Sequence, residues 1–277
     1  MEKQLKKVLL LDANNLIYRA RYSAKFAREG DAAVVYSFFR SLKPLLEKFE
    51  PEICYFVRDG NRGGREDILP AYKANRVYEK DESFMNQKKM IEFMMNEFFP
   101  IIVARDMGLE ADDLIGYLVN TQHAGDECIV VSSDTDFIQL LQTHENCLLY
   151  NPIAKKFREK PSYDYITWKS LRGDGADNIP GIPRVGDKTA EKLSKNPELL
   201  KSFLSESKDR FETFERNQRL IKFQDPSDIK EISYSGCYFD KESITKTFLD
   251  LSFNSMVKEN YLNKYFTALE RMNEENA

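Results

Sequence analysis

Two aspartates, Asp174 and Asp177, stand three residues apart immediately before the turn sequence NIPGIPRVGD and the lysine-bearing sequence KTAEKL. A turn of this composition that leads into a helix can bind an anion such as phosphate through the free N–H groups of the helix start. The region therefore combines two carboxylates with a loop suited to an anion. Because like charges repel, this combination needs an explanation.

Further acidic residues follow short apolar runs. Asp12 comes at the end of KVLLLDAN, Asp59 at the end of ICYFVRDG, and Asp134 and Asp136 at the end of CIVVSSDTD. In an open parallel sheet, ligands bind outside the carboxyl ends of the strands. If these runs are neighbouring parallel strands, the four carboxylates should lie along one edge of the sheet.

The segment LEADDL adds Glu110, Asp112 and Asp113 at an expected helix start. Carboxylates are favoured there by the helix dipole and by free N–H groups. Any one of these residues is most simply a cap or a turn residue. Seven carboxylates that reach the same edge from separate segments are harder to explain in that way.

Such a cluster requires cations. Two carboxylates about 6 Å apart repel each other by roughly 3 kcal/mol at an effective dielectric constant near 20. Oxygen ligands without His or Cys favour magnesium, manganese or calcium, and the size of the cluster favours two ions. The two histidines, His123 and His144, stand in polar contexts and are expected at the surface, so a histidine general base is not expected. The four widely spaced cysteines are expected to be reduced thiols.

The elements that position these residues alternate between strands and helices. Short runs rich in Val, Ile and Leu predict buried parallel strands, and longer periodic segments predict helices. The predicted strands are 7–14, 53–60 and 128–136, with 100–107 as a further candidate, and the predicted helices include 32–49, with a kink or break at Pro44, and 111–122. This alternation predicts an α/β domain. After about residue 160 the apolar runs typical of strands become rare, and the remainder is predicted to be helical.

Charge is distributed unevenly along the chain. Residues 151–222 carry 16 Lys and Arg against 11 Asp and Glu, whereas the whole chain has a net charge of −4. A basic surface beside an acidic pocket suits a metal-dependent enzyme that acts on a polyanion. No apolar run approaches the roughly 20 residues of a membrane helix. We therefore expect a cytoplasmic monomer without a membrane segment.

Five segments together resemble the 5' nuclease family, which includes bacteriophage 5' to 3' exonucleases, the 5' nuclease domain of bacterial DNA polymerase I, and flap endonucleases. The segments are VLLLDANNLIYR, YKANR, LEADDL, VSSDTDFIQLL and GDGADNIPGIPRVGDKTAEKL, and they occur in the family's order over about residues 5–225. The resemblance is strongest to the bacterial and phage branch, and the length without a polymerase resembles a phage replication exonuclease.

The resemblance implies both an architecture and an activity. It implies a PIN-like, mostly parallel sheet in residues 1–160 that includes a helical arch at 61–89, and a helical DNA-binding region, 161–277, with a helix-hairpin-helix at 174–195. The implied activity is hydrolysis of DNA from 5' ends and at 5' flaps, leaving a 5' phosphate. RNA in RNA–DNA hybrids is a further implied substrate, and replication or single-stranded-DNA-binding proteins are implied partners.

The resemblance also implies roles for individual residues. The family's metal carboxylates match Asp12, Asp59, Glu110, Asp112, Asp113, Asp134, Asp136, Asp174 and Asp177, which would hold two Mg²⁺ ions that Mn²⁺ can replace. This answers the question of Asp174 and Asp177: they resemble ligands of the second metal, while the turn after them resembles a hairpin that holds duplex phosphates, often with K⁺ at its carbonyl groups.

Basic and aromatic residues complete the implied site. Lys73 and Arg76 match the pair that contacts the scissile phosphate. The residues expected to contact nucleic acid are Tyr18, Arg19, Tyr72, Lys169, Arg184, Lys188 and Lys192. Tyr18 matches a position on which the terminal base stacks, and Tyr72 and Tyr78 lie in the predicted single-strand channel.

The chain departs from the family's pattern at three places. Arg58 stands where an apolar residue usually precedes the metal aspartate, Gly63 and Gly64 loosen the entry to the arch, and Arg184 replaces the first glycine of the hairpin. Two alternatives remain open at this stage. A PIN-type ribonuclease would share the acidic core but would normally lack the arch and hairpin, and a non-catalytic junction-binding protein would normally lose carboxylates.

Overall fold

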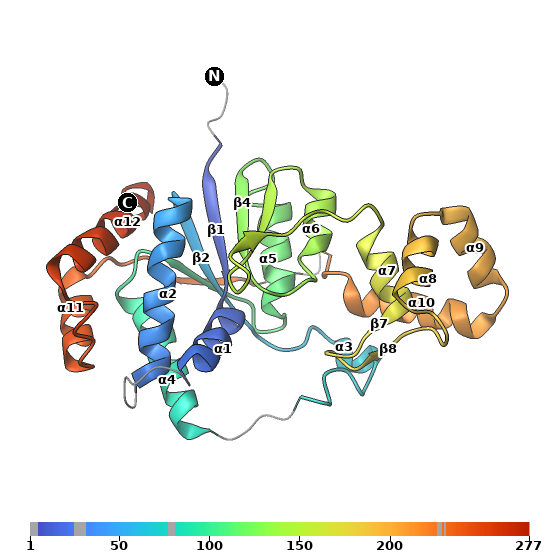
Figure 1. Ribbon diagram of the computed structural model, residues 1–277, viewed down its shortest axis with the longest axis horizontal. Coiled ribbons are helices and arrows are strands. Elements are labelled where there is room, and N and C mark those ends of the chain that lie inside the picture. The colour runs from blue at the N-terminus through green and yellow to red at the C-terminus, as the bar shows by residue number, and fades with distance from the viewer. Residues whose placement is uncertain (1–4, 25–31, 77–80, 226–228, 230, 277) are drawn as a thin grey trace.

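The computed structural model describes residues 5–24, 32–76, 81–225, 229 and 231–276, and side chains are described as far as residue 272. Its centre is a sheet with the strand order β6-β5-β4-β1-β2-β3-β9 (Figure 1). The strands are β1 Lys7–Asp12, β2 Ile53–Arg58, β3 Ile102–Arg105, β4 Glu127–Val131, β5 Cys147–Asn151, β6 Lys156–Phe157 and β9 Ser233–Gly236. The five inner strands are parallel, and the edge strands β6 and β9 are antiparallel to their neighbours.

Both faces of the sheet are covered, as the continuous apolar runs predict. Along β1, Leu9 and Leu11 point into one core while Val8 and Leu10 point into the other. The first core is closed by α1 Ala13–Ala24, α2 Ala33–Phe49, α4 Glu82–Glu97, α11 Lys241–Asp250 and α12 Glu259–Asn276, and the second by α5 Ala111–Asn120 and α6 Ile138–Thr143. The predicted α/β class is confirmed.

A helical region lies beside the sheet and has its own small core (Figure 1). It consists of α7 Tyr165–Arg172, α8 Asp187–Ser194, α9 Pro197–Ser205 and α10 Lys208–Ile221, with the two-residue strands β7 Gly173–Asp174 and β8 Ile179–Pro180 paired between α7 and α8. Leu171, Ile182 and Leu193 are buried in this core. The predicted hairpin segment therefore leads from the end of α7 into α8.

Several features differ from the sequence-based expectations. Helix α2 continues through Pro44 without a break. After α10 the chain returns to the sheet, where β9 pairs with β3, and α11 and α12 pack on the first core. The last part of the predicted region 161–277 thus lies with the sheet, and 233–236 is a strand that the helical expectation missed. The division of the chain at residue 160 stays a prediction.

The predicted arch, 61–89, is described only in part. Its beginning contains the short helix α3 Arg65–Ile68, and its end lies in α4, while residues 77–80, which include Tyr78, lie outside the described residues. The arch therefore stays a prediction. Within the described part of the chain, none of the helices has the length and apolar character needed to cross a membrane.

Candidate active site

The carboxyl end of β1 places Asp12 beside the aspartates that follow β2 and β4. Its carboxylate accepts hydrogen bonds from the Asn15 backbone N–H at 3.1 Å and the Ser132 hydroxyl at 2.8 Å. Burial, followed by the charges of Asp59 and Asp134, raises the Asp12 pKa to about 7. The predicted gathering of strand-end aspartates is therefore found at this edge.

Asp59 links the end of β2 to two helix starts. One of its oxygens accepts the Ala111 N–H of α5 at 2.7 Å, and the other accepts the side-chain amide of Asn14 in α1. Asp134 accepts the backbone N–H of Asp136 at 2.9 Å, which stabilises the turn after β4. Hydrogen bonds to their neighbours thus hold both carboxylates in place.

A second group lies at the start of α5. One oxygen from each of Glu110, Asp112 and Asp113 lies within 4.8 Å of the others. Burial, and then the charge of Asp113, raises the Asp112 pKa well above its ordinary value. A compact, partly desolvated set of oxygens of this kind favours a hard divalent cation.

Asp113 is fully buried, and protein groups engage both of its oxygens. Its two oxygens accept both terminal nitrogens of Arg65 at 2.7 Å, and the Gln224 N–H donates to it at 2.9 Å. Arg65 is only 2% exposed, and it also contacts Glu110 at 3.1 Å and the Leu220 carbonyl at 2.9 Å. Glu110 is engaged in a similar way, because it also accepts the Tyr72 hydroxyl at 2.8 Å and bonds the Lys73 ammonium. Asp112, which is only partly buried, is the best placed of the three to meet a cation.

A third group brings together residues from the loop after β4 and from the β7–β8 hairpin. Asp136, Asp174 and Asp177 each offer an oxygen within 4.8 Å of the others. The Lys169 ammonium bonds Asp136 and lies 2.7 Å from Asp174. Burial raises the Asp136 pKa to about 6 despite Lys169. For the less buried Asp174, the effect of burial is outweighed by Lys169 together with the backbone N–H groups of Ala176 and Asp177, so its pKa is lowered.

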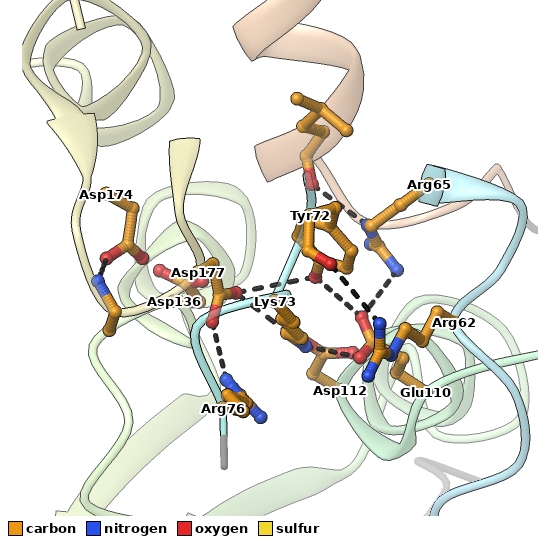
Figure 2. A network of polar contacts seen from close by, with 12 residues as sticks. Arg62, Arg65, Tyr72, Lys73, Arg76, Glu110, Asp112, Asp136, Asp174 and Asp177 are labelled. Carbon is orange, nitrogen blue, oxygen red and sulfur yellow. Dashed lines mark hydrogen bonds and ion pairs between the residues drawn. The ribbon is translucent and has the colours of Figure 1, made fainter. Parts of the chain in front are cut away.

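Lys73 and Arg76 lie between the second and third groups (Figure 2). The Lys73 ammonium bonds Glu110 and lies 3.7 Å from Asp177, while Arg76 pairs with Asp177. Burial by itself would lower the Lys73 pKa, but the charges of Glu110 and Asp177 raise it above its ordinary value. Both side chains therefore carry positive charge where the two carboxylate groups meet.

Two residues expected to contact nucleic acid lie inside the protein. Tyr72 is 2% exposed, and its hydroxyl donates to Glu110 at 2.8 Å, so its ring has no free face on which a base could stack. Lys169 is 5% exposed and is held by the third group. In this structure both residues support carboxylates, and a contact with nucleic acid stays a prediction for each.

The remaining predicted nucleic-acid residues lie away from these carboxylate contacts. Tyr18 and Arg19 are partly exposed on α1, and the Tyr18 ring lies 5.1 Å from that of Phe84. Lys188 and Lys192 are exposed on α8. Arg184 is exposed and has a φ of 68°, a left-handed conformation that explains why a glycine would suit this position.

Sequence reasoning missed several residues that shape the site. Arg65 and Lys88 lie in the predicted arch segment and Asn14 ends the predicted strand 7–14, and none of the three was assigned a role. The expectation for His123 was wrong: it is 7% exposed and lies between Asp126 at 2.9 Å and the Tyr55 hydroxyl at 3.0 Å. Its burial follows from the turn after α5, which folds back onto the sheet.

The donor set fits divalent cations. Both compact groups consist of carboxylates alone, they lie on either side of Lys73, and three further aspartates lie at the neighbouring strand ends. The second group would offer Asp112 and Glu110, and the third group Asp136, Asp174 and Asp177. Hard cations with oxygen ligands match this chemistry, and two ions match the two groups.

Comparisons with known proteins agree with this geometry. The family model of the 5'-3' exonuclease N-terminal, resolvase-like domain matches residues 7–167. The 5'-3' exonuclease of Buchnera aphidicola subsp. Schizaphis graminum is 26% identical over 274 residues, which cover 94% of this chain and 92% of that protein. Thermostable DNA polymerase I of Thermus filiformis is 30% identical over 202 residues, which cover 70% of this chain. The chain spans only 24% of that polymerase's length.

Solved structures share the fold. The bacteriophage T5 5'-exonuclease with bound zinc has a TM-score of 0.62 at 18% identity, covering 96% of this chain and 99% of that one. The catalytic core of Rad2 in complex with DNA substrate has a TM-score of 0.53 at 15% identity, covering 97% and 92%. The predicted family resemblance is therefore confirmed by the matched domain and supported by the shared fold. This chain belongs to the 5'-3' exonuclease family.

Proposed function

We propose that the chain is a structure-specific 5' nuclease that hydrolyses DNA from 5' ends and at 5' flaps with two Mg²⁺ ions. The single observation that carries this proposal is the pair of carboxylate groups on either side of Lys73. Family membership supports the same reaction class.

The proposed reaction assigns distinct tasks to the side chains. When bound, two Mg²⁺ ions would supply an activated water and stabilise the leaving 3' oxygen. Lys73 and Arg76 place positive charge beside the oxygens of the scissile phosphate, where charge develops during cleavage. The exposed Lys188 and Lys192 of α8 are suited to duplex phosphates, which position DNA without reading its sequence.

The wider role follows from this reaction. We place the enzyme in phage or bacterial replication and primer removal, acting as a monomer in the cytoplasm. Mn²⁺ is expected to replace Mg²⁺, and K⁺ to bind at the turn before α8. RNA–DNA hybrids are a second substrate class, and replication or single-stranded-DNA-binding proteins are the expected partners.

The test is cleavage of a 5'-flap DNA labelled at its 3' end. Wild type, Asp134→Ala and Lys73→Ala are compared in Mg²⁺, with Ca²⁺ as a binding control and Lys246→Ala, an exposed lysine of α11, as a control. Wild type and Lys246→Ala should cut near the junction, whereas the other two variants should bind the flap and lose cleavage. Flap binding by wild type without cleavage in Mg²⁺ or Mn²⁺ would favour the junction-binding alternative.

Single-stranded RNA and an RNA–DNA hybrid together test the remaining alternative, a PIN-type ribonuclease. Cleavage of single-stranded RNA without a requirement for a 5' end or a junction would favour a PIN-type ribonuclease. The proposed nuclease should instead require a 5' end or a junction in both DNA and RNA–DNA substrates.

A further inference from the structure

A short polar chain connects α4 to Asp59. The Lys88 ammonium donates to the side-chain carbonyl of Asn14 at 2.6 Å. The amide nitrogen of Asn14 in turn donates to one oxygen of Asp59, and the other oxygen accepts the Ala111 N–H at 2.7 Å. A residue at the end of the predicted arch is thereby joined to a carboxylate at the candidate metal site.

The direction of this chain is fixed by its donors and acceptors. A lysine ammonium has only donors, and an ionised carboxylate has only acceptors. Asn14 satisfies both when its oxygen faces Lys88 and its nitrogen faces Asp59. The opposite orientation would set donor against donor and acceptor against acceptor, so Lys88 holds the amide in the orientation that Asp59 requires.

An ion pair fastens the same helix to the end of β2. Arg58 contacts Glu92 of α4 at 2.6 Å, and Glu92 lies 3.9 Å from Lys88. The Arg58 and Glu92 side chains are 29% and 16% exposed, so the pair is partly shielded from water. Because Arg58 directly precedes Asp59, this unusual arginine anchors α4 at the point where the polar chain ends.

We propose that Asn14 and Lys88 are positioning residues that orient the Asp59 carboxylate for a divalent cation and couple metal binding to the position of α4. This assignment rests on the proposed metal-dependent nuclease function. Residues that orient metal ligands through hydrogen bonds typically change metal affinity by roughly 10–100-fold when they are replaced.

Electrostatics alone predicts the opposite effect of replacing Lys88 on the affinity for a cation. Removing a positive charge near a cation site should strengthen cation binding. The positioning role requires weaker binding, because Asn14 becomes free to rotate and Asp59 loses one of its two fixed donors, while the Ala111 N–H remains. Asn14→Leu separates the two effects further, since it breaks the chain without changing the charge.

The experiment measures Mn²⁺ binding to the full chain without DNA, from the electron paramagnetic resonance signal of the free ion. Lys88→Met and Asn14→Leu should each weaken binding by roughly tenfold, and the double variant should be no weaker than either single one. Lys88→Arg retains a donor and should recover most of the loss. The matched control is Lys89→Met, because Lys89 is the exposed neighbour on α4 and has no ion pair within the described chain.

The outcomes separate this assignment from the proposed function. Unchanged or tighter Mn²⁺ binding by Lys88→Met would overturn the positioning role while leaving the nuclease proposal intact. Additive losses in the double variant would also overturn it. If wild type bound no Mn²⁺, both proposals would fall. Circular dichroism verifies that each variant is folded. If Lys88→Met does not fold, Asn14→Leu provides the test.

Discussion

Arg65 should be among the most important residues for stability, because it neutralises the buried Asp113. The two side chains are 2% and 0% exposed and share two contacts of 2.7 Å. Opposite charges about 4 Å apart attract by roughly 4 kcal/mol at an effective dielectric constant of 20. Arg65→Met leaves the Asp113 charge buried without its partner, and the free energy of unfolding should fall by about 3–5 kcal/mol.

The assay is urea unfolding followed by circular dichroism at pH 7 with a chelator. Asp113→Leu should cost a similar amount, but the double variant Arg65→Met/Asp113→Leu should lie within about 2 kcal/mol of wild type, because both charges are then absent. Glu66→Gln is the control, since it breaks the exposed Arg62–Glu66 pair and should cost less than about 1 kcal/mol. Additive losses in the double variant would refute the pairing and return Asp113 to the predicted metal ligands.

Three further predictions concern charge and backbone geometry. The Asp12 pKa is raised to about 7 in the folded state, so between pH 4 and pH 7 the folded protein keeps a proton that the unfolded chain has lost. The free energy of unfolding of the metal-free protein should therefore fall as the pH rises through this range. Asp12→Asn should remove this fall and be more stable than wild type by about 2–4 kcal/mol above pH 7, and a pH-independent difference in thermal unfolding would contradict the cause. Lys169→Met should destabilise the metal-free protein by about 3 kcal/mol, and added Mg²⁺ should restore part of this loss. Equal losses with and without Mg²⁺ in thermal unfolding would contradict the position of Lys169 beside a cation site. Gly173→Ala should cost about 2–5 kcal/mol in urea unfolding, because φ is 80° and a Cβ would lie 2.3 Å from the Gly181 nitrogen, whereas Gly175→Ala, with open space around it, should be nearly neutral.

The parallel core could be predicted because its strands are continuous apolar runs. The predicted strands 7–14, 53–60 and 128–136 contain β1, β2 and most of β4, and the run at 100–107 contains β3. The carboxyl ends of such strands must meet at one edge of the sheet, so the sequence alone predicts that the aspartates lie together.

Strand β9 shows why other parts could not be predicted. Three of the four residues of Ser233–Gly236 are exposed, so the segment lacks the apolar run of a buried strand. It is a strand because the unpaired edge of β3 offers hydrogen bonds, and a sequence window does not contain that edge.

The ion pairs and hydrogen bonds of the site's cations could not be predicted from the sequence either. Arg65 meets the Leu220 carbonyl across 155 positions, and Lys73 and Arg76 meet Asp177 across about 100. Residue types indicated that cations were needed near the carboxylates, but only the folded chain determines which lysine or arginine reaches each one. Family resemblance placed Lys73 and Arg76 near phosphate, yet it did not indicate that Lys169 and Tyr72 would be buried.

The exposure of these four cations indicates how each can serve the site. Arg65 is almost fully buried and bonded on several sides, so moving it would leave Asp113 without a partner inside the protein. Arg76 is 43% exposed, and a phosphate could replace Asp177 as its partner at little cost in desolvation. Lys73 and Lys169, at 8% and 7% side-chain exposure, lie between these extremes. A substrate phosphate should therefore pair with Arg76 more readily than with the other three cations. Arg65 should keep its contacts with the start of α5 when substrate binds.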